Sequence, residues 1–210
     1  MYIAIEGVIG VGKTTLVRLL QPLFGAEGLL EVFEENPFLS SFYGDRERYA
    51  FQTQMFFLLS RYHQQRRAVP ATLARAPLIA DYTFAKDSLF ARINLKGDEL
   101  DMYYKVHEAL AEKIQKPDLL VYLQATTDTL MQRIALRDRP YERQMERSYI
   151  DELNKAYEDF FSKPFDHTPV LTIDTNNLNI IQNPEHLKWM ENRIRQSLSL
   201  PPFQQSLPLP

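Results

Sequence analysis

Short apolar runs alternate along the chain with longer segments in which apolar residues recur every three or four positions. Near-continuous apolar runs are typical of parallel strands covered on both faces, and the longer segments have the spacing of amphipathic helices. The expected strands cover 2–6, 29–33, 77–82, 118–124 and 170–174, and the expected helices cover 13–24, 46–67, 86–115, 127–137, 148–162 and 184–198. This alternation predicts an α/β fold: a parallel five-stranded sheet flanked by helices on both faces.

Length and composition narrow the class of protein. We expect the 210 residues to form one domain over 1–199, followed by a proline-rich, disordered tail over 200–210. The net charge of −3 argues against a nucleic-acid or anionic-membrane partner, and no apolar run approaches the ~20 residues that span a bilayer. There is no cysteine, which excludes disulfides and thiolate chemistry. With the first strand starting at Tyr2 we expect no targeting segment, and hence a cytoplasmic protein.

A phosphate-binding motif follows the first expected strand. In "YIAIEGVIGVGKTTLVRLL" the residues Gly7, Gly12, Lys13 and Thr14 have the G-x-x-x-x-G-K-[ST] spacing. Glycines let backbone N–H groups turn around a phosphate, the lysine adds charge at the β/γ position, and the threonine hydroxyl can ligate Mg²⁺. The motif lies between a strand and an amphipathic helix, which is its usual context. We expect ATP to contact Gly7, Gly10, Gly12, Lys13, Thr14 and Thr15.

The identity of the phosphate acceptor needs further motifs. A GTPase requires an N-K-x-D guanine motif after a late strand, but Asn154-Lys155 is followed by Ala-Tyr inside an expected helix. A helicase-type ATPase is usually longer and carries a basic track. A small kinase is the class that remains.

Four further segments resemble one family. "EVFEENPFLSSFY", "RYAFQTQMFFLLSRY", "IADYTFAKDSLFA" and "RIALRDRPYE" are similar, in order and spacing, to signature segments of the deoxyribonucleoside kinases, in particular the bacterial deoxyadenosine and deoxyguanosine kinases. The resemblance extends from the phosphate loop to about residue 161. It implies a P-loop kinase fold, ATP with Mg²⁺ as the donor, the 5′-hydroxyl of a purine deoxyribonucleoside as the acceptor, and a homodimer.

Three carboxylates crowd the stretch "LLEVFEENPFL". The resemblance places a general base five residues before the "NP" pair, which is Glu31. Its position beside an apolar strand predicts a pKa raised by desolvation. The alternative for Glu31 is a strand-end acid paired with an arginine, whereas Glu34 and Glu35 read as acids of the following turn.

Base recognition is expected on the helix that begins near residue 46. Gln54 and Arg61 are seven residues apart and so share a face, about 10.5 Å from each other. By sequence alone they are interpreted as ion-pair or capping residues, but the resemblance implies that they read the base, with Asp87 as the partner of Arg61. Phe84 is expected to stack on the base, with core packing as the alternative.

The resemblance also implies the sugar and metal ligands. It gives Tyr43 and Glu142 the 3′-hydroxyl, with the tyrosine crowding C2′ against ribose, and it gives Thr14 and Asp81 the Mg²⁺ ion. The chain departs from the family at Tyr82, where most members have an arginine near the reacting 5′-oxygen. Lys86 is a candidate replacement.

An arginine-rich stretch over about 137–147 is expected to form a lid. The match to R-x-x-x-R-x-R assigns Arg133 and Arg137 to catalysis and Arg137 and Arg139 to ATP binding. Without the resemblance, such a run is usually a solvated helix face. Closing a lid only when both substrates are bound suppresses hydrolysis by water.

Two other functions share this architecture. A thymidylate-like nucleoside monophosphate kinase needs arginines around an acceptor phosphate and no carboxylate base. A non-catalytic assembly subunit keeps the fold without turnover. Adenine and guanine both stay open as the base, and the segment 97–115 is either a dimer face or core against the sheet.

Overall fold

A computed structural model of the chain describes residues 1–163, 165 and 168–202. Its centre is a five-stranded sheet in the order β2-β3-β1-β4-β5. Every strand pairing is parallel, with Ile3 of β1 opposite Ile79 of β3 and Leu119 of β4. The strands are β1 (Tyr2–Glu6), β2 (Glu27–Leu29), β3 (Leu78–Ala80), β4 (Leu119–Gln124) and β5 (Val170–Asp174). The predicted parallel five-stranded sheet is confirmed.

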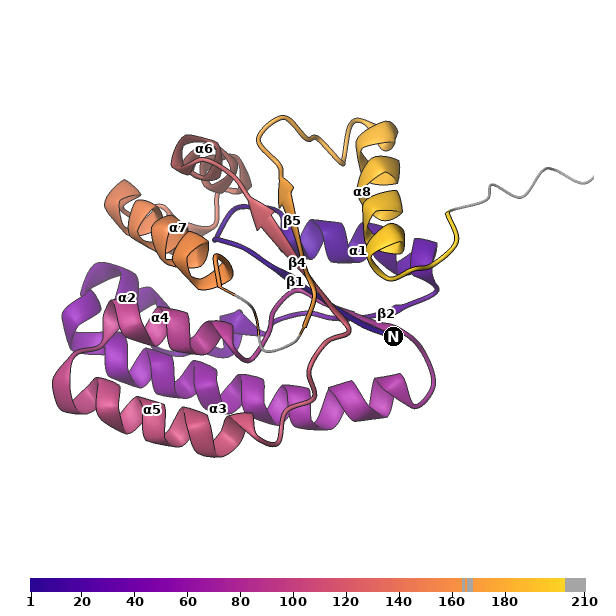
Figure 1. Cartoon of the computed structure of the whole chain (residues 1–210). Helices are drawn as coiled ribbons and strands as arrows, with labels where there is room; N and C mark the ends of the chain where they lie inside the picture. Colours follow the sequence, from indigo (N-terminus) through magenta and orange to yellow (C-terminus); the bar gives the residue numbers. More distant parts are fainter. Residues whose placement is uncertain (164, 166–167, 203–210) are drawn as a thin grey trace, which may run out of the picture.

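Helices cover both faces of this sheet, because a helical connection crosses over between each pair of successive parallel strands. The helices are α1 (Lys13–Phe24), α2 (Leu39–Gly44), α3 (Arg46–Leu73), α4 (Lys86–Asn94), α5 (Gly97–Ala111), α6 (Thr127–Arg137), α7 (Arg147–Phe161) and α8 (Pro184–Ser197). Figure 1 shows α1 and α8 on one side of the sheet and α3, α4, α5 and α7 on the other. The central strand β1 is buried along its whole length.

The second strand differs from its prediction, and the difference moves the candidate base. The expected strand 29–33 is wrong, since β2 ends at Leu29. Beyond that point the β3 ladder has run out, and the backbone N–H of Glu31 donates instead to the Asp81 carboxylate (2.8 Å). Phe33–Glu35 forms a single 3₁₀ turn. The chain therefore leaves the sheet edge before Glu31 and turns across the carboxyl ends of the strands.

Two predicted helices also have different bounds. The expected helix 86–115 is two helices, because Leu95 is extended and Gly97 has a φ of +53°, a conformation that favours glycine. The expected helix 46–67 continues through Pro70 to Leu73. The short helix α2 was not predicted.

The segment 97–115, a candidate dimer face, packs inward through much of its apolar surface. Tyr103 is fully buried, and the other apolar residues in the following list are partly buried against the main core: Leu100, Tyr104, Val106, Leu110 and Ile114. Met102 on α5 and Leu59 on α3 are about half exposed. In the described part of the chain α5 packs on α3 and α4, and both the dimer face and the core against the sheet stay predictions.

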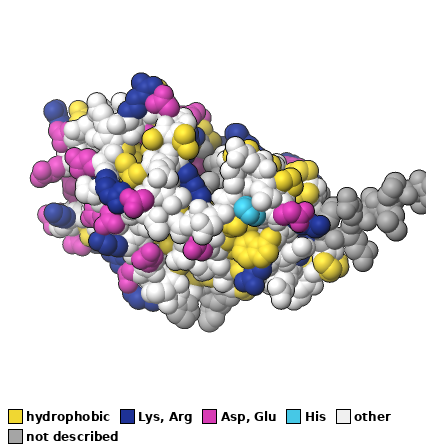
Figure 2. Space-filling model, turned by 90° about the horizontal axis from the view of Figure 1, so that it is seen from above, with side chains coloured by type: hydrophobic (Ala, Val, Ile, Leu, Met, Phe, Trp, Pro, Cys, Tyr) yellow, Lys and Arg dark blue, Asp and Glu magenta, His cyan; other side chains and the backbone are white. Residues whose placement is uncertain are grey.

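The surface carries no broad area of one charge on the face seen from above, where acidic and basic side chains are interspersed (Figure 2). Within the described part of the chain, every helix is too short or too polar to cross a bilayer. The predicted disordered tail lies largely outside the described residues, which end at Pro202.

Candidate active site

The phosphate loop joins β1 to α1 at the carboxyl edge of the sheet. Gly7 has a φ of +147°, and a Cβ there would lie 2.5 Å from the carbonyl oxygen of Leu123. Gly12 has a φ of +105° directly before α1. Only glycine fits these positions without strain. The loop thus turns its backbone toward the helix N-terminus, the arrangement that binds phosphate.

Lys13 reaches back over this loop. Its ammonium group donates to the carbonyl oxygens of Gly7 (2.6 Å) and Val8 (3.1 Å). Burial and the neighbouring charge of Lys86 lower the pKa of Lys13 to about 8, against the opposing pull of three carboxylates. An anion in the loop would restore the lysine's charge, because a nearby negative group favours the protonated form.

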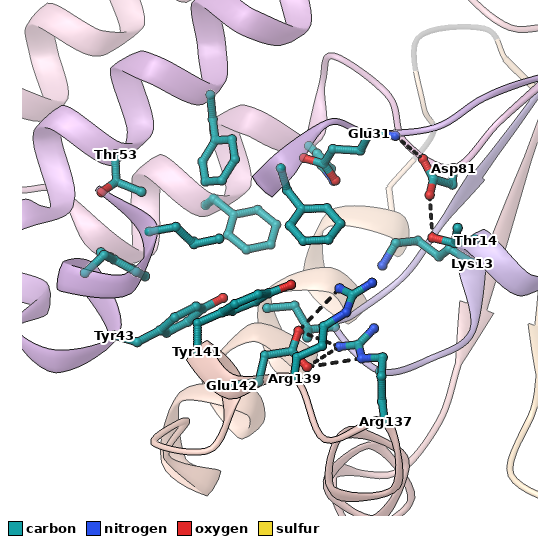
Figure 3. Close-up of a pocket in the computed structure, with 18 of the residues that line it drawn as sticks. Lys13, Thr14, Glu31, Tyr43, Thr53, Asp81, Arg137, Arg139, Tyr141 and Glu142 are labelled. Carbon is teal, nitrogen blue, oxygen red and sulfur yellow. Dashed lines mark hydrogen bonds and ion pairs between the residues drawn. The ribbon is translucent and has the colours of Figure 1, made fainter. Parts of the chain in front are cut away.

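A cavity of about 330 Å³ opens beside the loop, within the usual range for a small-molecule site. It is lined by most of the predicted residues: Gly10, Gly12, Lys13, Thr14, Thr15, Glu31, Tyr43, Gln54, Arg61, Asp81, Arg137, Arg139 and Glu142. Figure 3 shows Lys13 and Glu31 on one side of this space and Arg137, Arg139 and Glu142 across from them. Residues from five separate segments of the sequence therefore converge here.

Glu31 is held in this cavity by two cations. Arg61 donates to Oε1 through Nε (2.7 Å) and through its NH2 group, and Lys86 donates to Oε2 (2.6 Å). Burial alone would raise the pKa of Glu31, but the charges of Arg61 and Lys86 lower the pKa to about 2. The predicted upward shift is wrong, and the pairing with an arginine that was its alternative is observed. Glu34 and Glu35 are exposed.

Arg61 links Glu31 to a second carboxylate. Its NH1 group donates to Oδ1 of Asp87, which is fully buried. The other oxygen of Asp87 has no hydrogen-bond partner among the described residues. Gln54 is also buried on α3 and lines the cavity. The predicted partnership of Arg61 and Asp87 is present, and base reading by these residues stays a prediction.

Phe84 does not line the cavity. Its ring stacks on His107, with centroids 4.9 Å apart, and meets Tyr62 edge-on. It lies in the core between α3, α4 and α5, so the core-packing alternative describes it. Phe57 and Phe90 are the phenylalanines that line this end of the cavity instead, and Phe57 lies under the Arg61 guanidinium at 4.5 Å.

Two oxygen ligands suited to Mg²⁺ lie together at the base of the loop. The Thr14 hydroxyl donates to Oδ2 of Asp81 (2.5 Å), and the other oxygen of Asp81 accepts from the backbone of Glu31. Magnesium is usually held by one or two protein oxygens together with substrate phosphates and water. The pair fits that ion, and when bound Mg²⁺ would neutralise charge on the β- and γ-phosphates.

Two arginines of the predicted lid contact Glu142. Arg137 contacts both Glu142 oxygens (2.6 and 2.7 Å), and Arg139 lies 3.6 Å away. Glu142 is almost fully buried, and Tyr43 lies near it. The pKa of Tyr43 is raised well above its ordinary range, mainly by burial and also by neighbouring groups that include Glu142. The predicted pair of Tyr43 and Glu142 lines one cavity, but Glu142 also pairs with Arg137 and Arg139.

Arg133 lies on the other side of the phosphate loop. It donates to the carbonyl oxygens of Val11 (3.2 Å) and Thr175 (2.6 Å), and it lines a second cavity of about 660 Å³. Its guanidinium thus ties the loop to the end of β5. Arg137 lines both cavities, so the two spaces adjoin at the loop. A catalytic role for Arg133 stays a prediction.

Three of the cavity residues that were not predicted are Tyr141, Phe33 and Thr53. Tyr141 lies nearly parallel to Tyr43 (centroids 6.4 Å apart), and the Arg139 guanidinium lies 4.5 Å over Phe33. The hydroxyl of Thr53 is buried and has no hydrogen-bond partner among the described residues. Tyr141 and Phe33 could have been predicted, because each is an aromatic residue next to an acidic residue of a site motif, Glu142 and Glu34. A threonine within a helix gives no such indication.

Comparison with known proteins agrees with this geometry. The family model described as "Deoxynucleoside kinase" matches residues 3–199. A deoxyguanosine kinase of Bacillus subtilis is 35% identical over 199 residues, covering 93% of this chain and 96% of the relative. A deoxyadenosine kinase of Dictyostelium discoideum is 32% identical over 194 residues, covering 90% and 77%.

Solved structures show the same likeness. A deoxyadenosine kinase from M. mycoides with dCMP and dCDP bound superposes with a TM-score of 0.81 at 25% identity, covering 93% of this chain and all of that one. The same enzyme with dATP bound gives 0.80 at 26% identity. The phosphate loop, the Glu31 carboxylate facing it and the match over nearly the whole chain together show that the chain belongs to the deoxynucleoside kinase family.

Proposed function

We propose that this kinase transfers the γ-phosphoryl group of ATP to the 5′-hydroxyl of a purine deoxyribonucleoside and thereby serves nucleotide salvage. The observation that carries the proposal is that Glu31, Lys13, Gln54 and Arg61 line one cavity of about 330 Å³. A monophosphate acceptor would bring its own charge and would need no carboxylate. The family match and this carboxylate both favour a nucleoside.

Glu31 accepts the proton of the 5′-hydroxyl in this proposal. Each carboxylate oxygen can accept more than one hydrogen bond, so the pairs with Arg61 and Lys86 leave room for the acceptor. A pKa of about 2 makes Glu31 a weak base. That suffices here, because phosphoryl transfer usually passes through a loose transition state in which positioning and charge stabilisation dominate.

The donor occupies the other side of the loop. Its phosphates lie in the cradle of Gly7–Thr15 with Lys13, and Thr14 and Asp81 would hold Mg²⁺. Its base extends into the second cavity, of about 660 Å³, beside Arg133. Acceptor and donor then approach the loop from two adjoining spaces, as an in-line displacement requires.

The lid supplies charge to the transferred group. Arg137 and Arg139 are both paired with the buried Glu142 beside the acceptor space, and Arg137 lines the donor space as well. Electrostatic groups that are already in place when charge develops are the largest single contribution in many enzymes. We expect the 3′-hydroxyl to reach Tyr43 and Glu142, and the aromatic pair Tyr43 and Tyr141 to close over the sugar.

The base is read at the end of the cavity. Arg61 offers donors, Gln54 offers a donor and an acceptor, and the unpartnered Asp87 oxygen is an acceptor behind Arg61. Both purines present a matching edge. The relatives include deoxyguanosine kinases and deoxyadenosine kinases, so we propose a purine acceptor without choosing between them.

A panel of acceptors tests the substrate class. Purified protein is incubated with ATP, Mg²⁺ and each of the four deoxynucleosides, the matching ribonucleosides and thymidine monophosphate, and product is separated by chromatography. We expect the highest kcat/KM with deoxyguanosine or deoxyadenosine, and little product from ribonucleosides or the monophosphate. Preferred turnover of thymidine monophosphate would overturn the proposal.

A matched pair of variants tests the base. Glu31→Gln removes the proton acceptor at nearly constant volume, and Glu34→Gln changes an exposed acid three residues away. We expect the first to lower kcat by about 10²–10⁴-fold, the usual effect of a general base, and the second to leave it unchanged. Loss of activity in Glu34→Gln alone shows that the wrong carboxylate was chosen.

Three further features belong to the proposal. ATP and deoxynucleosides are cytoplasmic metabolites, and we expect the protein to act in that compartment with Mg²⁺. We also expect a homodimer, for which the half-exposed Leu59 and Met102 offer apolar contacts. Light scattering that gives the mass of a monomer at micromolar concentration contradicts the dimer.

A further inference from the structure

A buried lysine lies at the acceptor end of the cavity. Lys86 opens α4, is only 5% exposed and lines the cavity beside Glu31. Its ammonium group donates to Oε2 of Glu31 at 2.6 Å. Burying a lysine is costly unless its charge is used or compensated. The ion pair with Glu31 supplies that compensation and holds the ammonium group at the wall of the cavity.

The ammonium group of Lys86 has N–H donors that no protein acceptor uses within the described part of the chain. A lysine has three N–H donors, and Glu31 is the only hydrogen-bond acceptor of Lys86 within the described part of the chain. Its other neighbours are aromatic faces, with the centroid of Tyr82 at 5.6 Å and that of Phe90 at 6.0 Å. Such contacts steady a cation but use none of its hydrogen atoms. Two donors are thus available to a ligand beside Glu31.

Tyr82 does not supply a charge at this place. It is fully buried, and its hydroxyl donates to Oε1 of Gln64 (2.6 Å), whose amide donates in turn to the carbonyl oxygen of Leu30 (2.8 Å). This chain of hydrogen bonds braces the segment that presents Glu31. The ring of Tyr82 faces the ammonium group of Lys86, so at this place the lysine carries the positive charge.

We propose that Lys86 is a catalytic residue that donates to the reacting 5′-oxygen and the incoming phosphoryl group. In the transfer, the bond from O5′ to the γ-phosphorus forms and the bond from that phosphorus to the bridging oxygen of ATP breaks, with its electron pair leaving on ADP. The 5′-hydroxyl proton goes to Glu31. Lys86 keeps its proton throughout and stabilises negative charge. This inference rests on the proposed function.

The geometry separates this role from a purely structural one. Glu31 is also held by Arg61, so the carboxylate stays anchored when Lys86 is replaced. A charge that acts on the transferred group lowers kcat when removed, whereas a charge that only shapes the pocket changes KM.

Variants at this position test the inference. Lys86→Met removes the charge, Lys86→Gln keeps a donor without charge in case the first variant fails to fold, and Lys86→Arg keeps both. Lys188→Met, on the exposed face of α8, is the matched control. Steady-state kinetics are measured with the best deoxynucleoside of the acceptor panel, and ATP binding is measured separately by calorimetry.

We expect Lys86→Met and Lys86→Gln to lose about 10²–10³-fold in kcat, the effect of removing one such donor. The KM for the nucleoside and the affinity for ATP should change by about threefold or less, the arginine variant should recover at least about tenfold, and the control should match the unmodified protein. A kcat within about threefold in Lys86→Gln, a loss confined to KM, or no recovery with arginine overturns the inference. An unmodified protein that phosphorylates no deoxynucleoside overturns the proposed function itself.

Discussion

Removing Arg61 should destabilise the protein far more than removing a surface arginine. Arg61 is 5% exposed and is the ion-pair partner of Asp87, which is fully buried. Glu31 keeps Lys86 when Arg61 is replaced, so the uncompensated charge falls on Asp87. Breaking a buried pair from one side costs about 3–5 kcal/mol, and methionine retains most of the arginine's apolar volume. We therefore expect Arg61→Met to lower the free energy of unfolding by about 3–5 kcal/mol.

Urea unfolding at pH 7, followed by far-ultraviolet circular dichroism, measures this change. Arg75→Met is the control, since Arg75 and its partner Glu27 are both exposed, and we expect no change there. The double variant Arg61→Met/Asp87→Leu removes both buried charges and should regain most of the loss, because apolar groups often replace a buried pair at little cost. If Arg61→Met is as stable as Arg75→Met, or if the double variant is no better than the single one, the reasoning is refuted.

Two other perturbations follow from the phosphate loop. Gly7→Ala should lower the free energy of unfolding by about 1–3 kcal/mol through backbone strain, since its φ is +147° and a Cβ would meet the Leu123 carbonyl; a urea titration in which it matches Gly44→Ala, where a Cβ has open space, argues against this. Because the pKa of Lys13 is lowered to about 8, the free protein loses that charge as pH rises, so ATP affinity measured by calorimetry should weaken from pH 7 to pH 9, and Lys13→Met should remove the dependence. An affinity that stays level in the unmodified protein contradicts it.

The architecture followed from local patterns alone. Near-continuous apolar runs alternate with amphipathic segments, and the glycines of the phosphate loop have to lie between a strand and a helix. These patterns depend only on residues close in sequence, so they can be recognised without knowledge of the tertiary structure. The exception was β2, whose last ladder bond is replaced by the Asp81 side chain contacting the Glu31 backbone. That substitution couples residues fifty positions apart, and no local pattern contains it.

The sequence does indicate the break between α4 and α5, but the helical spacing of apolar residues on both sides favoured one continuous helix. Gly97 follows an extended Leu95, and a glycine inside an apparently continuous helical pattern marks a candidate boundary. Apolar residues continue at helical spacing on both sides of it, which made one long helix the simpler prediction.

The site was predictable in membership and much less so in electrostatics. Most of the residues singled out by motif converge on the cavity, because the carboxyl ends of parallel strands meet at one edge of the sheet. The pKa of Glu31 was predicted with the wrong sign, since its strand position shows burial but not the two cations that arrive from α3 and α4. The prediction that Phe84 stacks on the base was replaced by its core-packing alternative for a related reason. An aromatic next to a site motif packs inward or outward according to neighbours on other helices.

The central claim is that the Glu31 carboxylate contacts the hydroxyl that receives the phosphoryl group. A crystal structure with a purine deoxynucleoside and a non-hydrolysable ATP analogue tests it most directly. The account predicts a Glu31 oxygen at about 2.6–3.2 Å from O5′, with O5′ facing the γ-phosphorus across the loop. An O5′ that contacts another residue, while Glu31 remains occupied by Arg61 and Lys86 alone, would contradict it.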